Sequence, residues 1–184
     1  MAVWTKVRTA TAVLSGGVLG AVLLTAGCND DASREASVAA MQAATPTGVA
    51  ASLPSTRKHI YPEIGSAQAD VHAAFQEAKK THKRVLLDFG GDWCGDCQVL
   101  DIYFGQTPNA ELLAKYFVKV NVNIGRQDAN LDIAKKYGVP VHGVPALAVV
   151  DANGKVIVSQ DKEFSSMRNM QSSAVTDFLN KWKQ

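Results

Sequence analysis

Residues 85–97 of this chain read VLLDFGGDWCGDC. The first five are apolar apart from Asp88 and begin with a β-branched residue, which favours a buried strand. The two glycines that follow predict a tight turn, and Cys94 and Cys97 then stand three positions apart. A helix that begins at Cys94 places this sulfur at the helix N-terminus, where unpaired N–H groups and the helix dipole favour a thiolate. The stretch therefore predicts a strand, a turn and a redox dithiol that opens a helix.

The Cys-x-x-Cys spacing has a second interpretation, because structural zinc sites use it too. Such a site needs two further ligands, and the sequence holds no second pair of this kind. The histidines are scattered along the chain, at His59, His72, His82 and His142. We therefore favour redox chemistry over zinc and expect no bound metal.

The composition is that of a globular protein. Of 184 residues, 47% are hydrophobic and 20% are charged, which allows one domain with a proper core plus extensions. The formal net charge is +2, but Lys6 and Arg8 lie at the start of the chain. Without them 17 of the 19 basic residues remain, and these equal the 17 acidic residues in number. A near-neutral domain gives no reason to expect nucleic acid as a partner.

Residues 1–27 have the pattern of a secretory signal peptide, with a basic start and an apolar run that ends at Gly27. The residues LTAG before Cys28 resemble the lipobox of bacterial lipoproteins, although Thr25 stands where leucine is commonest. In that family the signal is removed and the cysteine is acylated. The resemblance thus implies lipidation of Cys28 and an anchor on the periplasmic side of the bacterial cell envelope. An uncleaved membrane anchor and plain secretion stay open as alternatives.

Residues 28–58 predict a flexible tether, because they are rich in Ala, Ser, Thr and Pro and lack a large apolar periodicity. A flexible tether of this length has an end-to-end distance of about 30 Å and reaches about 100 Å when fully extended. We expect one globular domain over residues 59–184.

The domain predicts an α/β fold. Helices are expected over residues 66–82, 94–104, 108–116, 128–137 and 172–182, and strands over residues 85–89, 117–124, 146–150 and 156–158. Ser66 and Thr107 are the expected N-caps of the first and third helices, and Asn153-Gly154 predicts a type I′ hairpin. Strands separated by helices pair in parallel, and the hairpin adds antiparallel strands. The sheet is therefore expected to be mixed.

With this order of elements, three features resemble the thioredoxin superfamily: Asp88 in the first strand, the WCGDC motif of residues 93–97, and Gly143-Val144-Pro145 before the third strand. The resemblance covers residues 66–184. It implies a thioredoxin-like fold with a central mixed sheet of four to five strands flanked by helices.

Asp92-Trp93-Cys94 together with Thr107-Pro108-Asn109 is most similar to the C-terminal domain of the membrane thiol-reductant transporter DsbD. Single-domain bacterial thioredoxin-like lipoproteins related to that domain share the pattern. This narrower resemblance implies a membrane thiol-reductant donor as a partner.

The resemblance implies a role for each matching residue. Cys94 is the attacking thiol, Cys97 the buried resolving thiol, and Asp88 the buried carboxylate that relays the proton of Cys97. The surface that binds substrate is implied to include Trp93, Gly95, Asp96, Val144 and Pro145. Pro145 is the implied cis-proline, and Val144 offers its backbone to an incoming chain.

Several positions leave alternatives open. Gly138-Val139-Pro140 is a near copy of the implied cis-proline segment, so Pro140 is a rival for the cis bond. Asp88 either lies half exposed at a strand end or is buried, in which case desolvation raises its pKa and suits a proton shuttle. The sequence also departs from thioredoxin itself, because Asp96 replaces the usual proline and Ala146 the usual threonine.

Asp92 and Asp96 flank Cys94. Negative charge near a thiolate raises the thiol pKa and makes the disulfide less oxidising, which favours a reductant. In the alternative, both acids point to water and are screened, and Asp96 merely favours the helix start.

These features predict a membrane-tethered, extracytoplasmic thiol–disulfide oxidoreductase that reduces disulfides of exported proteins. The Cys94–Cys97 pair is the only redox group required, so no cofactor is expected. The alternative is a copper chaperone on the same scaffold that uses Cys94, Cys97 and His142, since soft thiolates bind Cu(I). Proteins of that kind carry a longer spacing between their cysteines, which counts against it.

Overall fold

The structure of the protein is a computed structural model, and residues 56–184 are described. The predicted signal peptide, Cys28 and all but the last residues of the predicted tether lie outside the described residues. The strands are β1 (Arg84–Gly90), β2 (Phe117–Asn123), β3 (Ala146–Val150) and β4 (Val156–Gln160). The helices are α1 (Ala67–Thr81), α2 (Gly95–Phe104), α3 (Asn109–Tyr116), α4 (Leu131–Lys136) and α5 (Ser172–Trp182), with short 3-10 turns at Ile64–Ser66 and Met167–Asn169.

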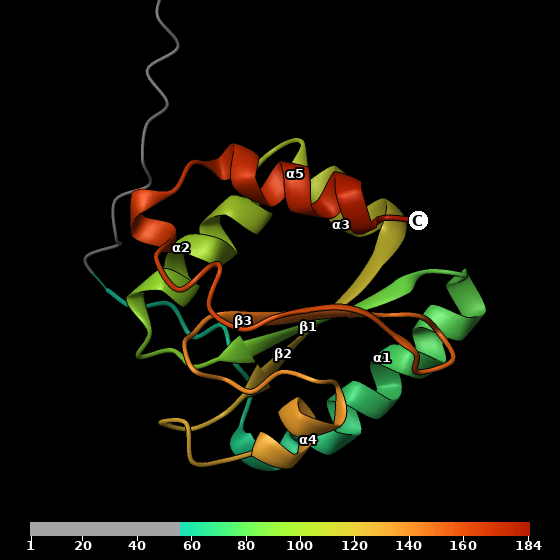
Figure 1. Cartoon of the computed structure of the whole chain (residues 1–184), viewed down its shortest axis with the longest axis horizontal. Helices are drawn as coiled ribbons and strands as arrows, with labels where there is room; N and C mark the ends of the chain where they lie inside the picture. The colour runs from blue at the N-terminus through green and yellow to red at the C-terminus, as the bar shows by residue number, and fades with distance from the viewer. Residues whose placement is uncertain (1–55) are drawn as a thin grey trace, which may run out of the picture. The chain divides into compact units, whose positions relative to one another are not determined.

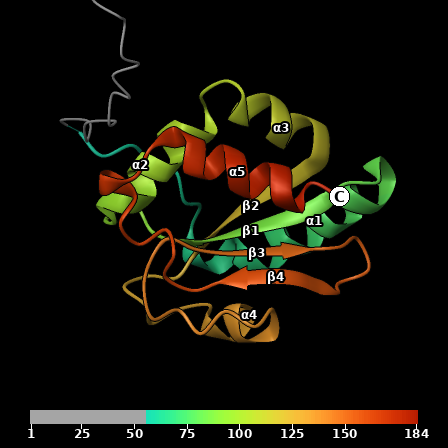
Figure 2. The same ribbon diagram turned by 45° about the horizontal axis from the view of Figure 1, so that its top comes forward.

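The strands form one mixed sheet in the order β2-β1-β3-β4. β1 pairs in parallel with β2 and antiparallel with β3, and β3 pairs antiparallel with β4. Helices α1 and α4 cover one face of the sheet, and α2, α3 and α5 cover the other (Figures 1 and 2). This confirms the predicted α/β class, with four strands in the sheet.

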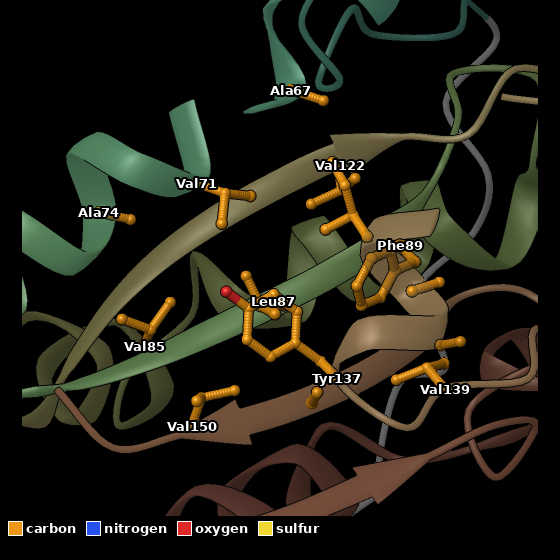
Figure 3. Packing of buried hydrophobic residues seen from close by; sticks show 14 of the residues in the cluster. Ala67, Val71, Ala74, Val85, Leu87, Phe89, Val122, Tyr137, Val139 and Val150 are labelled. Carbon is orange, nitrogen blue, oxygen red and sulfur yellow. The ribbon is translucent and has the colours of Figure 1, made fainter. Parts of the chain in front are cut away.

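Alternation along β1 divides the core into two layers. Val85, Leu87 and Phe89 point to the α1 side, where they meet apolar residues of α1, β2 and α4 (Figure 3). Leu86 belongs to the cluster under α2 and α5. Since side chains alternate along a strand, Asp88 shares the face of Leu86 and points to the side that carries α2.

The predicted helices differ from the observed ones at their N-termini, in the first residue or in the N-cap. α4 begins at Leu131 rather than at residue 128, because Asn130 adopts a left-handed conformation with φ of 52°. Ser66 is the N-cap residue of α1 as predicted, but its side chain makes no capping hydrogen bond, since its hydroxyl instead interacts with the Glu63 carbonyl and the Asp70 carboxylate. Thr107 does not cap α3, whose N-cap residue is Pro108 and which has no side-chain cap.

The β3–β4 hairpin is as predicted, but its turn is not type I′. A type I′ turn needs positive φ at both central residues, and only Gly154 has one, at 92°. The carboxylate of Asp151 accepts hydrogen bonds from the N–H groups of Asn153 and Lys155, at 2.8 and 2.9 Å. The aspartate therefore shapes this turn.

Among the described helices, none has both the length and the apolar character that crossing a bilayer requires.

Candidate active site

The two cysteines of the motif open α2. Cys94 is the N-cap residue, in extended conformation, and Cys97 lies in the first turn of the helix. The two sulfurs form a disulfide, with the α-carbons 5.2 Å apart. The backbone N–H of Cys97 also points at the sulfur of Cys94, at 3.1 Å. This N–H is one of the donors that would stabilise a Cys94 thiolate in the reduced state, as the sequence predicts.

The loop before β3 lies against the dithiol. The Val144–Pro145 peptide is cis, which resolves the choice between Pro145 and Pro140. The carbonyl oxygen of Val144 is 3.7 Å from the sulfur of Cys94, so the backbone of Val144 borders the reactive sulfur. A second cis peptide, Thr107–Pro108, precedes α3 and was not predicted.

Trp93 packs beside the dithiol, against the small buried cluster that contains both cysteines. Its indole N–H donates to the carbonyl of Gly125 at 2.6 Å, and the guanidinium of Arg126 lies 5.5 Å from the ring centre. The loop after β2 thus fixes the indole. Gly95, the first residue of α2, directly follows Cys94 and is half-buried.

Asp96 does not point to water, so that alternative is wrong for this residue. The residue is 7% exposed. Its carboxylate accepts hydrogen bonds from the backbone N–H of Arg168 at 2.9 Å and from the Arg168 guanidinium at 3.2 Å. The charge of Asp96 is therefore offset by an arginine that lies 72 positions further along the chain, which sequence spacing does not reveal.

Asp92 also has hydrogen-bond partners, and these lie in the segment that precedes α1. Its Oδ1 atom accepts hydrogen bonds from the N–H groups of Ile60 and Tyr61, at 2.8 and 2.9 Å, and Oδ2 meets the ring of His59. Burial alone raises the pKa of Asp92, but these hydrogen bonds outweigh it, so the pKa is lowered. The carboxylate therefore stays ionised and holds this segment in place.

We call residues 58–62 the strap, because several contacts bind them across this end of the sheet. The amide of Gln98 on α2 accepts from the N–H of Lys58 at 3.0 Å and donates to its carbonyl at 2.7 Å. Asn121 on β2 donates to the carbonyl of Ile60, at 2.6 Å. The chain thus enters the domain beside the dithiol, through residues 59–62 of the predicted domain and the last residue of the predicted tether.

Tyr61 is the functional-site residue that sequence reasoning missed. It is fully buried and packs with Cys94 and Cys97. Its hydroxyl donates to Oδ1 of Asp88 at 2.9 Å. A tyrosine outside any periodic helix or strand carries no sequence signal for this position.

Asp88 lies beneath this cluster and is 2% exposed, so the half-exposed alternative is wrong. Besides Tyr61, its carboxylate faces the ammonium of Lys119 at 3.8 Å, and the same ammonium lies 3.9 Å from Asp101. Burial raises the pKa of Asp88, and Lys119 and Tyr61 lower it by less than burial raises it. The direction is the one predicted, and it gives a carboxyl group that exchanges a proton more readily near neutral pH than an exposed aspartate does.

Gly90 allows these groups to approach one another. A β-carbon at this position would lie 2.7 Å from Cζ of Tyr61 and 2.8 Å from the sulfur of Cys97. The ring of Tyr61 and the sulfur of Cys97 therefore border the same point, within about 5.5 Å of one another. A larger residue at Gly90 would separate them.

Comparisons with known proteins agree with this geometry. The sequence model of a family described as thioredoxin-like matches residues 66–152. The crystal structure of a disulphide isomerase from Xylella fastidiosa Temecula1 is 35% identical, with a TM-score of 0.66, and the match covers 70% of this chain and 100% of that one. The chain belongs to the thioredoxin superfamily.

Two curated relatives support the same assignment of this thioredoxin-like chain. The thiol:disulfide interchange protein DsbD of Vibrio vulnificus is 32% identical over 80 residues, which is 44% of this chain and 13% of DsbD. An H-type thioredoxin of Fagopyrum esculentum is 32% identical over 82 residues, which is 45% of this chain and 64% of that protein. The chain thus spans only a small part of the length of DsbD. Together with the Cys94–Cys97 disulfide, these matches identify a thioredoxin-like thiol–disulfide oxidoreductase.

The alternative of a copper site gains no support from the thioredoxin-like geometry. His142 is largely exposed, and its Nδ1 atom lies 2.6 Å from the carboxylate of Asp161. Within residues 56–184, no group of three or more His, Cys, Asp and Glu side chains is arranged to hold a metal ion. The structure therefore does not join His142 to the cysteines as a ligand set.

The raised pKa of Asp88 predicts a pH-dependent effect of Asp88→Asn on stability. The folded protein holds the proton of Asp88 at pH values where the unfolded chain has lost it, so wild-type stability falls as pH rises from the ordinary pKa of 3.8 through the raised one. The amide cannot ionise and escapes this loss. Asp88→Asn should therefore exceed the wild type in free energy of unfolding at pH 8, by about 1.4 kcal/mol for each unit of pKa elevation.

Urea unfolding of the oxidised protein at a series of pH values measures this difference, which should shrink as pH falls below the raised pKa. The matched control is Asp177→Asn on the exposed face of α5, for which we expect a change below about 0.5 kcal/mol at every pH. A destabilised Asp88→Asn protein at pH 8 would contradict the assignment.

Proposed function

We propose that this protein is a membrane-tethered, extracytoplasmic disulfide reductase that acts on disulfides of exported proteins. The observation that supports it best is the position of the Cys94 sulfur. It lies at the N-terminus of α2, against the N–H of Cys97 and 3.7 Å from the carbonyl of Val144. A thiolate at this point has N–H donors that stabilise it, and an extended substrate segment finds backbone groups beside it.

The chemistry needs only the two cysteines and an electron donor. In the reduced protein, the Cys94 thiolate attacks a substrate disulfide, whose S–S bond breaks as a mixed disulfide forms and one substrate thiolate leaves. Cys97 then loses its proton to Asp88 and attacks the sulfur of Cys94. The Cys94–Cys97 bond forms, and the second substrate sulfur leaves as a thiolate. The structure describes the oxidised form that results, and no cofactor takes part in the proposed reaction.

The surface around Cys94 is proposed to bind the substrate chain. The carbonyl of Val144, presented by the cis-Pro145 loop, would pair with a backbone N–H of the substrate. Trp93 and Gly95 border the same sulfur from the side of α2. We place Asp96 further from the bound chain, because its carboxylate is tied to Arg168.

The reducing direction is supported by the buried Asp88 rather than by Asp92 and Asp96, the two acids that flank Cys94. Arg168 offsets Asp96 and His59 faces Asp92, so these two acids contribute less than the sequence alone implies. When Asp88 is ionised beneath the cysteines, it disfavours a second negative charge on Cys97. A Cys97 thiol that stays protonated adds no thiolate stabilisation to the reduced form, which makes the disulfide less oxidising than it would be with both thiols ionised.

Equilibration with glutathione redox buffers tests the direction. The midpoint potential of the Cys94–Cys97 couple should lie below that of protein disulfide isomerase, about −180 mV. Insulin reduction should be lost in Cys94→Ser, while Cys97→Ser should accumulate a mixed disulfide with its substrate. A midpoint at or above −180 mV would remove the reductase proposal and leave an oxidant or isomerase.

The tether and the location are proposed from the sequence before residue 59. A signal peptide over residues 1–27 would export the protein, and a lipid on Cys28, the residue after the cut, would attach it with the domain on the periplasmic side. A membrane thiol-reductant donor would then restore the dithiol. Residues 28–58 would let the domain reach substrates at some distance from the bilayer.

Replacement of the proposed lipid acceptor tests this part separately. In cells that export the full chain, Cys28→Ser should move the protein from the membrane fraction to the soluble fraction. The purified variant should keep full insulin reductase activity, because Cys28 takes no part in the exchange. Membrane association that is the same with and without Cys28 would contradict lipid anchoring.

A further inference from the structure

Tyr61 contacts both of the groups that the family roles have exchange a proton, Asp88 and Cys97. Its hydroxyl donates to Asp88 at 2.9 Å, and its ring borders the same point above Gly90 as the sulfur of Cys97. The family roles assign the donor and the acceptor of the proton, but they leave open how it travels between them. We propose that the hydroxyl of Tyr61 is a proton relay that carries the proton of Cys97 to Asp88.

The proposed step conserves protons. As the thiol of Cys97 gives its proton to the oxygen of Tyr61, the tyrosine gives its own hydroxyl proton to Asp88. Cys97 becomes a thiolate, Asp88 becomes neutral, and Tyr61 is neutral before and after. The Cys97 thiolate then attacks the sulfur of Cys94 in the mixed disulfide and displaces the substrate thiolate. The oxidant is the substrate disulfide.

Burial gives Tyr61 the property that a relay requires. Burial and the nearby charge of Asp88 raise its pKa well above the ordinary value of 10.0. The phenol therefore does not ionise near neutral pH, and it passes a proton on rather than storing a charge. Asp88, whose own pKa is raised by burial, is the group that holds the proton.

The strap keeps the phenol at this point. Asp92 accepts hydrogen bonds from the N–H groups of Ile60 and Tyr61, so the backbone that carries the ring is fixed to the residue before Trp93. Asn123 on β2 donates to the carbonyl of Pro62 at 2.7 Å. These hydrogen bonds indicate that Asp92 positions Tyr61, rather than that it adjusts the pKa of the Cys94 thiol.

The other charged groups near Asp88 are Lys119 on β2 and Asp101 on α2. Lys119 lies 3.8 Å from Asp88, lowers its pKa and is itself partly exposed. It therefore adjusts the carboxyl group from the β2 side, while Tyr61 occupies the side that borders Cys97. Asp101 raises the pKa of both Asp88 and Tyr61.

Stopped-flow reaction of the reduced protein with Ellman's reagent tests the relay. The first thionitrobenzoate released reports attack by Cys94, and the second reports resolution by Cys97. In Tyr61→Phe the first phase should be unchanged, while the second should be about tenfold slower near pH 7, the effect of a one-unit change in a pKa. The difference should disappear at a pH where Cys97 is already ionised, since a thiolate needs no base.

Two comparisons separate a relay from a general loss of packing. Tyr103→Phe removes another buried hydroxyl, which donates to the carbonyl of Met170, and should leave both phases unchanged. Tyr61→Phe combined with Asp88→Asn should be no slower in the second phase than Asp88→Asn alone, because both changes interrupt one path. An unchanged second phase in Tyr61→Phe, or slowing that persists at high pH, would overturn the proposal.

A measurement on the unmodified site covers the case in which Tyr61→Phe folds poorly. In reduced protein labelled with ¹³C at the tyrosine ζ-carbons, the Tyr61 signal should shift with pH at the apparent pKa of Asp88. A signal that does not respond to this titration would also overturn the relay.

The relay depends on exchange by the dithiol but not on the proposed location or direction. Failure of the first phase would therefore count against the oxidoreductase, and failure of the second phase alone against the relay.

Discussion

A carboxylate buried in the central strand of the sheet is the constraint on which the rest of the site depends. Asp88 lies at a position of β1 that is hydrogen-bonded on both sides, opposite Asn121 and Leu147. Asp88 is only 2% exposed, so a charge on it needs partners, and Lys119 and Tyr61 supply them. An apolar residue at this position would pack at lower cost. The proposed proton transfer gives a reason for a carboxyl group at this position, beneath a dithiol.

The position of Tyr61 follows from that constraint. The phenol reaches Asp88 only because the strap crosses the end of the sheet, and the strap stays there because Asp92, Gln98 and Asn121 bind its backbone. Gly90 leaves room for the ring beside Cys97. The segment that leads into the domain is therefore part of the candidate active site.

The fold and the dithiol could be predicted because their signals are local. The apolar run of β1, the cysteine spacing and the Pro145 segment each stand within a few residues, and the structure bears out the mixed sheet, the start of α2 and the cis bond at Pro145. The burial of Asp88 was one of two alternatives that the sequence left open, and the structure decides for it. The turns were predicted less accurately, because periodicity shows neither the left-handed Asn130, after which α4 begins, nor the hydrogen bonds by which Asp151 shapes the hairpin turn.

The partners of the acids could not be predicted, because they are distant in the sequence: Asp96 meets Arg168, and Asp88 meets Tyr61.

The most direct test of the account is a ¹³C NMR titration of the Asp88 side-chain carboxyl in the oxidised protein. The account predicts an apparent pKa clearly above the ordinary value of 3.8. An apparent pKa at or below 3.8 would mean that Lys119 and Tyr61 simply hold a structural carboxylate, and would contradict its role as the proton acceptor.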